Sequence, residues 1–162
     1  RQKKYWHYDI KKLGNNYRLS DINCALGFSQ LKKIDQFKKK RKKIFDLFKK
    51  KFSKYEKFLI FPNIKNKDNL YHLFLIGFNF KNLKSNKKKL LKNLNLNGIF
   101  PQFHYKPIFK FSFYNNLKKN NFPGAMKYYK NFISLPIFFQ LTSKQQVYII
   151  SKIISFIKKN IK

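Results

Sequence analysis

Residues 13–31 read LGNNYRLSDINCALGFSQL, a polar loop that leads directly into a long patterned helix. Gly14 and the asparagines after it suit a loop that needs positive φ or local side-chain to backbone bonds. Ser20 is a favourable N-cap, so the helix is expected to follow it. Asn16 and Arg18 lie two residues apart, which in an extended segment places both side chains on one face. An amide and a guanidinium on one face make this loop a candidate anion site.

The helix that follows is predicted to be long and amphipathic, with room for a break, because its apolar residues recur mostly at threes and fours. Ala25 and Gly27 are small enough to indicate a close approach by another backbone, as at a dimer seam. Cys24 is the only cysteine, which excludes an internal disulfide and a thiolate metal site, and it is expected to be a small buried hydrophobe. The apolar positions are Ile22, Leu26, Leu31, Ile34, Phe37, Ile44, Phe45, Phe48 and Phe52.

The rest of the chain alternates short apolar runs with helical patterns. Asn97 and Gly98 resemble a helix C-cap, and Thr142 with Gln145 has the spacing of a capping box. The order strand, helix, strand predicts an α/β layer with a small sheet flanked by helices, and not a helical bundle. The expected strands are 58–61, 70–80, 99–105 and 133–138; the expected helices begin at Ser85, Gly124 and Thr142, the last with a core stripe of Val147, Ile150, Ile154 and Ile157.

The net charge of +32, from 38 basic and 6 acidic residues, admits two explanations. A lysine-rich nucleic-acid-binding module would use residues 38–51 and bind with a steep salt dependence. A nucleotide bias explains the same abundance, because Lys, Asn, Ile, Phe and Tyr share A/T-rich codons and lysines are spread along the whole chain. We favour the nucleotide bias, so nucleic acid is not the expected partner. No apolar run approaches a membrane span, and a cytoplasmic location fits best.

The opening stretch resembles the DegT/DnrJ/EryC1/StrS sugar aminotransferases, whose pattern is close to G-x-N-Y-R-[LM]-S-D-x-x-A-A-L-G-x-x-Q-L. The similarity continues through Leu70-Tyr71-His72-Leu73-Phe74, Phe103-His104-Tyr105-Lys106-Pro107 and Ser134-Leu135-Pro136-Ile137-Phe138. With Trp6, Tyr8 and Tyr114, these motifs most resemble the branch that makes the 4-amino sugar precursor of pseudaminic acid. Family members are dimeric pyridoxal-phosphate (PLP) enzymes that move an amino group from glutamate to a keto-sugar nucleotide, here a UDP-linked 4-keto-6-deoxy-hexosamine.

The resemblance assigns roles to four residues. Asn16 would cross the dimer interface and bond the PLP phosphate of the neighbouring subunit. Arg18 would hold a phosphate or carboxylate of the substrate, with an interface ion pair as the alternative. His104 and Tyr105 would lie on the sugar-binding side, and a histidine hydrogen-bonded within a sheet is the alternative for His104. The branch often has a second histidine where this chain has Phe109.

The resemblance also implies that the catalytic lysine lies outside this chain. The Schiff-base lysine of the family belongs to an S-x-H-x-x-K motif in an upstream large domain, and no such motif occurs here. We therefore expect the C-terminal small domain of a fold-type-I aminotransferase, with residues 1–19 as lead-in and cofactor-phosphate loop and 20–162 as the small domain. Alone it would be inactive. The chain is expected to be either a truncated piece of the complete enzyme or a catalytically dead remnant of a split gene.

Overall fold

The computed structural model describes residues 12–63, 69–114 and 122–162, and the chain divides into two compact units, Arg1–Ile34 and Asp35–Lys162. The predicted lead-in therefore lies mostly outside the described residues, together with Trp6, Tyr8 and most of the loop after Pro62. No helix in the described ranges is long and apolar enough to span a membrane.

The first unit contains an extended segment and the helix α1 (Asp21–Leu31). Ser20 caps this helix as predicted, since its hydroxyl accepts the N–H of Asn23 at 3.4 Å. A turn at Lys32 and Lys33 then separates α1 from α2 (Ile34–Phe52), so the predicted long helix does have a break.

The apolar residues of α1 are not buried within the described part of the chain. Cys24 is exposed, so its predicted burial is wrong: nothing described packs over its side of the helix. A Cβ added to Gly27 would meet no atom within 4 Å, so the close approach expected there is not made within the described chain. The residues that stay exposed include Ile22, Leu26, Phe28 and Leu31.

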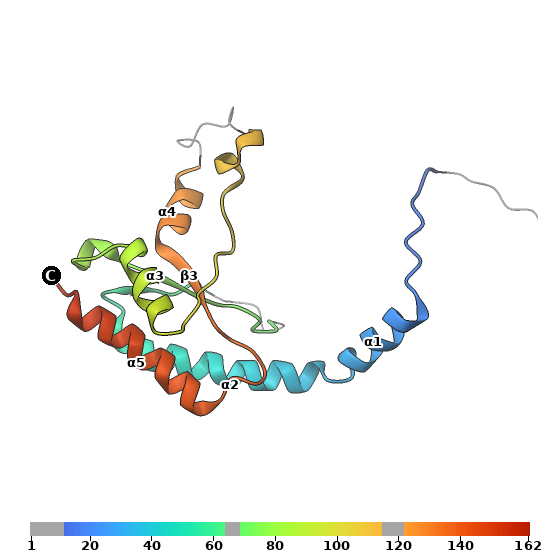
Figure 1. The fold of residues 1–162 in the computed structure, drawn as a ribbon, viewed down its shortest axis with the longest axis horizontal. Coiled ribbons are helices and arrows are strands. Elements are labelled where there is room, and N and C mark those ends of the chain that lie inside the picture. The colour runs from blue at the N-terminus through green and yellow to red at the C-terminus, as the bar shows by residue number, and fades with distance from the viewer. Residues whose placement is uncertain (1–11, 64–68, 115–121) are drawn as a thin grey trace, which may run out of the picture. The chain divides into compact units, whose positions relative to one another are not determined.

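The second unit is built on a three-stranded antiparallel sheet in the order β1-β2-β3, formed by β1 (Leu59–Ile60), β2 (Phe74–Phe78) and β3 (Phe132–Leu135) (Figure 1). The central strand β2 pairs Phe78 with Leu59 and Phe74 with Leu135. Because every pairing is antiparallel, the architecture is α+β, a small sheet with helices packed around it.

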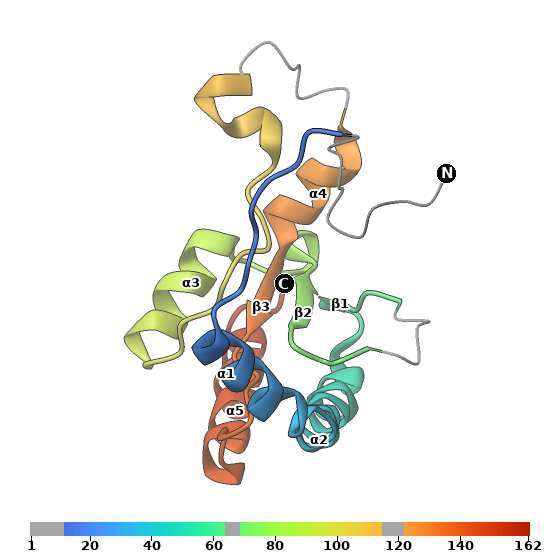
Figure 2. The ribbon, with the colours of Figure 1, turned by 90° about the vertical axis from the view of Figure 1, so that its right-hand side faces the viewer.

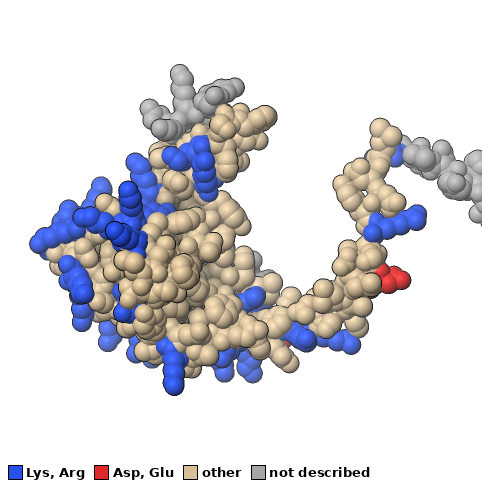
Figure 3. Space-filling view, in the orientation of Figure 1, with Lys and Arg blue, Asp and Glu red and all other residues tan. Residues whose placement is uncertain are grey.

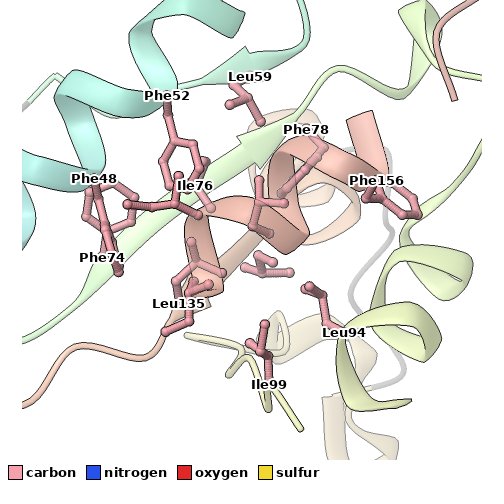
Figure 4. Close-up of a cluster of buried hydrophobic side chains, with 14 of the residues drawn as sticks. Phe48, Phe52, Leu59, Phe74, Ile76, Phe78, Leu94, Ile99, Leu135 and Phe156 are labelled. Atoms are coloured by element: carbon pink, nitrogen blue, oxygen red, sulfur yellow. The ribbon is translucent and has the colours of Figure 1, made fainter. Parts of the chain in front are cut away.

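Helices α2, α3 (Lys87–Leu96) and α5 (Ser143–Lys159) surround the core, and α4 (Pro123–Asn131) leads directly into β3 (Figures 1 and 2). Core side chains from α2, β2, α3 and α5 meet in one cluster (Figure 4). In α2 the buried residues Ile44, Phe48 and Phe52 follow a spacing of four, which is one face of a helix. Phe48 and Phe74 meet edge to face, with ring centroids 5.1 Å apart.

The capping box of the last helix is confirmed, since Thr142 and Gln145 exchange bonds at the start of α5. Its predicted core stripe is partly wrong, because Val147 is 62% exposed and Ile154 only half-buried. Ile149, Ile153 and Phe156 are buried instead, since α5 presents a face rotated toward them. At α3 the N-cap is Asn86, one residue after the predicted Ser85.

The strand predicted at 99–105 is wrong. Only Gln102 pairs, through an isolated bridge with Ser134 of β3. Pro101 has no N–H to donate, and Phe100 and Phe103 remain exposed on either side of the bridge. This segment therefore leaves the sheet edge as a loop immediately before His104.

Candidate functional site

His104 is attached to the edge of the sheet through β3. Gln102 and Ser134 exchange two backbone hydrogen bonds, of 3.0 and 2.9 Å, which hold the loop beside a strand residue that is only 3% exposed. From this position the Ser134 hydroxyl lies 2.7 Å from Nδ1 of His104. Because the serine hydroxyl can donate or accept, this contact fixes the ring for either tautomer of the imidazole.

Tyr128 of α4 holds the backbone of the same histidine, since its hydroxyl donates to the His104 carbonyl at 2.9 Å. The Tyr128 ring stacks on Phe132, with centroids 4.8 Å apart and planes 16° apart. Burial raises the pKa of Tyr128, so the phenol stays protonated and remains a donor at neutral pH. His104 is thus held at both its ring and its backbone by residues on either side of the junction between α4 and β3.

Tyr105 lies beside the histidine and points outward. Its side chain is 75% exposed, and its ring meets the His104 ring edge-on at 4.8 Å. Nε2 of His104 makes no hydrogen bond to a described residue. An imidazole nitrogen and a phenol side by side can bind the hydroxyl or carbonyl groups of a polar ligand.

Lys87, at the start of α3, ties the α4–β3 junction together. Its ammonium donates to the carbonyls of Tyr129 and Phe132, at 2.6 and 2.7 Å. It also lies 4.6 Å from the ring centroid of Phe103 and 5.2 Å from that of Tyr129. Burial lowers the pKa of Lys87 to about 8. Lys87 therefore stabilises the α4–β3 junction (the α4–β3 corner), which carries both residues that hydrogen-bond to His104.

Sequence reasoning did not single out Lys87, Tyr128 or Ser134. Lys87 begins a run of three lysines at 87–89, and nothing in that run distinguishes it from its neighbours. Ser134 does lie in the S-L-P motif that carries the family resemblance, which is the signal that could have found it.

Asn16 and Arg18 belong to the other unit, in the extended segment that precedes α1. Both side chains are exposed, and neither makes a hydrogen bond to a described residue. The neighbouring Asn15 instead donates to the Tyr17 hydroxyl at 2.9 Å. The amide and guanidinium donors of Asn16 and Arg18 thus fit a phosphate group, because all their N–H groups are available to it.

Comparison with known proteins identifies the family. A model of the DegT/DnrJ/EryC1/StrS aminotransferase family matches residues 1–154. The chain belongs to this family. It is 36% identical, over 159 residues, to UDP-4-amino-4,6-dideoxy-N-acetyl-beta-L-altrosamine transaminase of Campylobacter jejuni subsp. jejuni, and this match covers 98% of the chain and 42% of the relative.

Solved structures of aminotransferases have the same fold. PseC of Helicobacter pylori, an aminotransferase involved in the biosynthesis of pseudoaminic acid, superposes with a TM-score of 0.80 at 31% identity, over 98% of this chain and 43% of that one. The Streptococcus pneumoniae protein Spr1654 in its PMP form gives a TM-score of 0.80 at 25% identity, over 95% of this chain and 39% of that one. The chain therefore spans about two fifths of the length of the relatives it matches.

One departure from the family pattern has a structural explanation. Phe109, where the aminotransferase branch often has a second histidine, is buried and stacks on Phe122 with centroids 5.2 Å apart and planes 7° apart. It packs the aromatic loop and offers no polar group to a ligand. His72, expected inside a strand, is exposed and precedes β2. No group of three His, Cys, Asp or Glu residues that could hold a metal occurs among the described residues.

Proposed function

We propose that this chain is the C-terminal part of a PLP-dependent sugar aminotransferase that moves an amino group from glutamate to a UDP-linked 4-keto-6-deoxy-hexosamine, in pseudaminic acid or related amino-sugar biosynthesis. The observation that carries the proposal is family membership over residues 1–154 together with 36% identity to a transaminase of that substrate class. A large domain with the Schiff-base lysine precedes residues 1–19 in the proposed protein, which works as a cytoplasmic homodimer.

The proposed roles rest on the family motifs and on the donors that each side chain offers. Asn16 donates its amide N–H to the cofactor phosphate of the neighbouring subunit; a neutral donor adds no unpaired charge to an interface. Arg18 binds a phosphate or carboxylate of the substrate through its guanidinium. His104 and Tyr105 bind the sugar, with the imidazole oriented by Ser134 and the backbone held by Tyr128. When bound, PLP supplies the electron sink for amino transfer.

The test uses the complete protein, with its large domain, and measures PLP retention after dialysis together with transamination of the keto-sugar nucleotide by glutamate. Asn16→Ala removes one hydrogen bond to a charged group, worth about 1.5–3 kcal/mol, so PLP affinity should fall about 10- to 100-fold. Asn15→Ala is the matched control, because Asn15 bonds Tyr17 within its own segment. Equal PLP retention by the two variants would show that Asn16 does not bind the cofactor phosphate.

A further inference from the structure

A polar pocket lies between α3 and α5. Its volume is about 260 Å³. Three lysine side chains line it, Lys89 from α3 and Lys152 and Lys159 from α5, together with amides and hydroxyls that include Asn93 and Ser85. Lys89 follows Lys87 by two residues, which on a helix is a rotation of about 200°, so the pocket and the His104 corner use opposite sides of α3.

The pocket has no negative charge of its own. No Asp or Glu lines it. All six acidic residues of the chain lie within residues 1–68, and the sequence from Asn69 to Lys162 contains none. A uniform nucleotide bias would enrich lysine throughout but would not separate the acidic residues in this way. Lysines gather over α3 and the C-terminal end of α5 (Figure 3).

Three ammonium groups around one pocket repel one another. An anion bound among them would reduce this repulsion.

We propose that this pocket binds a small, multiply charged oxyanion of the diphosphate class, held by Lys89, Lys152 and Lys159. Oxyanions match the chemistry because every lysine N–H can donate to their oxygens. The pocket is smaller than the roughly 300–1,000 Å³ of sites for drug-sized ligands, which favours a free diphosphate over a whole nucleotide. The site is independent of the proposed amino transfer.

The test measures diphosphate binding by the purified, PLP-loaded protein, using calorimetry and thermal unfolding at matched ionic strength. Diphosphate should raise the unfolding temperature, because a ligand that binds only the folded state stabilises it. The triple variant Lys89→Gln, Lys152→Gln, Lys159→Gln should bind diphosphate at least tenfold more weakly. The control is Lys39→Gln, Lys43→Gln, Lys50→Gln, which removes three exposed charges from α2 and should leave binding unchanged.

Equal losses of affinity in the two triple variants would mean that net charge alone attracts the anion, and would overturn the proposal. Unchanged binding in the pocket triple variant would overturn it as well.

Discussion

Replacing Lys87 by Met tests whether this lysine braces the α4–β3 corner. Methionine keeps a flexible apolar side chain of similar length but removes the ammonium and its bonds to the carbonyls of Tyr129 and Phe132. Each bond from a charged group contributes about 1.5–3 kcal/mol, and a cation over a ring about 0.5–1 kcal/mol. Lys87 is half-buried, so water partly replaces these contacts and desolvation of the charge offsets them. We expect a net destabilisation of about 1.5 kcal/mol.

The assay is urea unfolding at pH 7, with the free energy of unfolding compared between variants. Lys88→Met is the matched control, because Lys88 is the next residue, is exposed and has no hydrogen-bonded partner among the described residues. It should change stability by less than about 0.5 kcal/mol, as surface substitutions usually do. If Lys87→Met and Lys88→Met destabilise equally, the two carbonyl contacts do not stabilise the corner.

A comparison of wild type with Lys87→Met at several pH values tests the pKa of Lys87. Burial lowers this pKa in the folded protein to about 8, from an ordinary 10.5. Between these two values the unfolded chain binds more protons than the folded one, so Lys87 makes the free energy of unfolding rise with pH. The stability difference between wild type and Lys87→Met should therefore widen from pH 8 to 10.5, with a shallow slope because water screens the half-buried group. A difference that narrows would show that the carbonyls and rings favour the charged amine more than burial disfavours it.

Two further substitutions test the frame around the site. Gly77→Ala would place a Cβ 2.8 Å from the Phe132 ring and 3.1 Å from Cβ of Ile60. Because the Phe132 ring is stacked on Tyr128, we expect the free energy of unfolding to fall by about 1–3 kcal/mol, measured by thermal unfolding. An unchanged melting temperature would show that the Phe132 ring can move freely. Thr142→Ala removes the cap of α5 and should cost about 1 kcal/mol, whereas Thr142→Ser should restore most of it; equal melting temperatures for the two variants would argue against the capping box.

The parts of the fold that the sequence predicts well are those with local causes. Ser20, Thr142 and the apolar run of β2 act through neighbours within a few residues, so spacing alone identifies the caps and the strand. The predictions that failed concern features that tertiary contacts determine. Whether Val147 or Ile149 faces the core depends on how α5 is rotated against α2 and the sheet. The apolar pattern of one helix does not determine which of two adjacent apolar faces is buried.

The sequence proposes candidate site residues only where they stand in a family motif. Asn16, His104 and Tyr105 stand in such motifs, but the residues that orient His104 come from elsewhere in the chain. Lys87 contacts residues 42 and 45 positions away, and Tyr128 and Ser134 reach His104 across 24 and 30 positions. Such contacts depend on topology, which composition and periodicity do not contain.

The faces of α1 and α2 differ in burial, and the proposed homodimer accounts for this difference. Apolar residues recur along both helices, yet Ile44, Phe48 and Phe52 are buried while Ile22, Leu26 and Leu31 are not. A contiguous apolar face that the described residues of its own unit leave exposed is typical of a protein–protein interaction site. In the proposed homodimer the neighbouring subunit covers α1, and the segment before it then carries Asn16 to the neighbour's cofactor phosphate. Burial of α1 and binding of the phosphate are therefore expected to be lost together when the dimer dissociates.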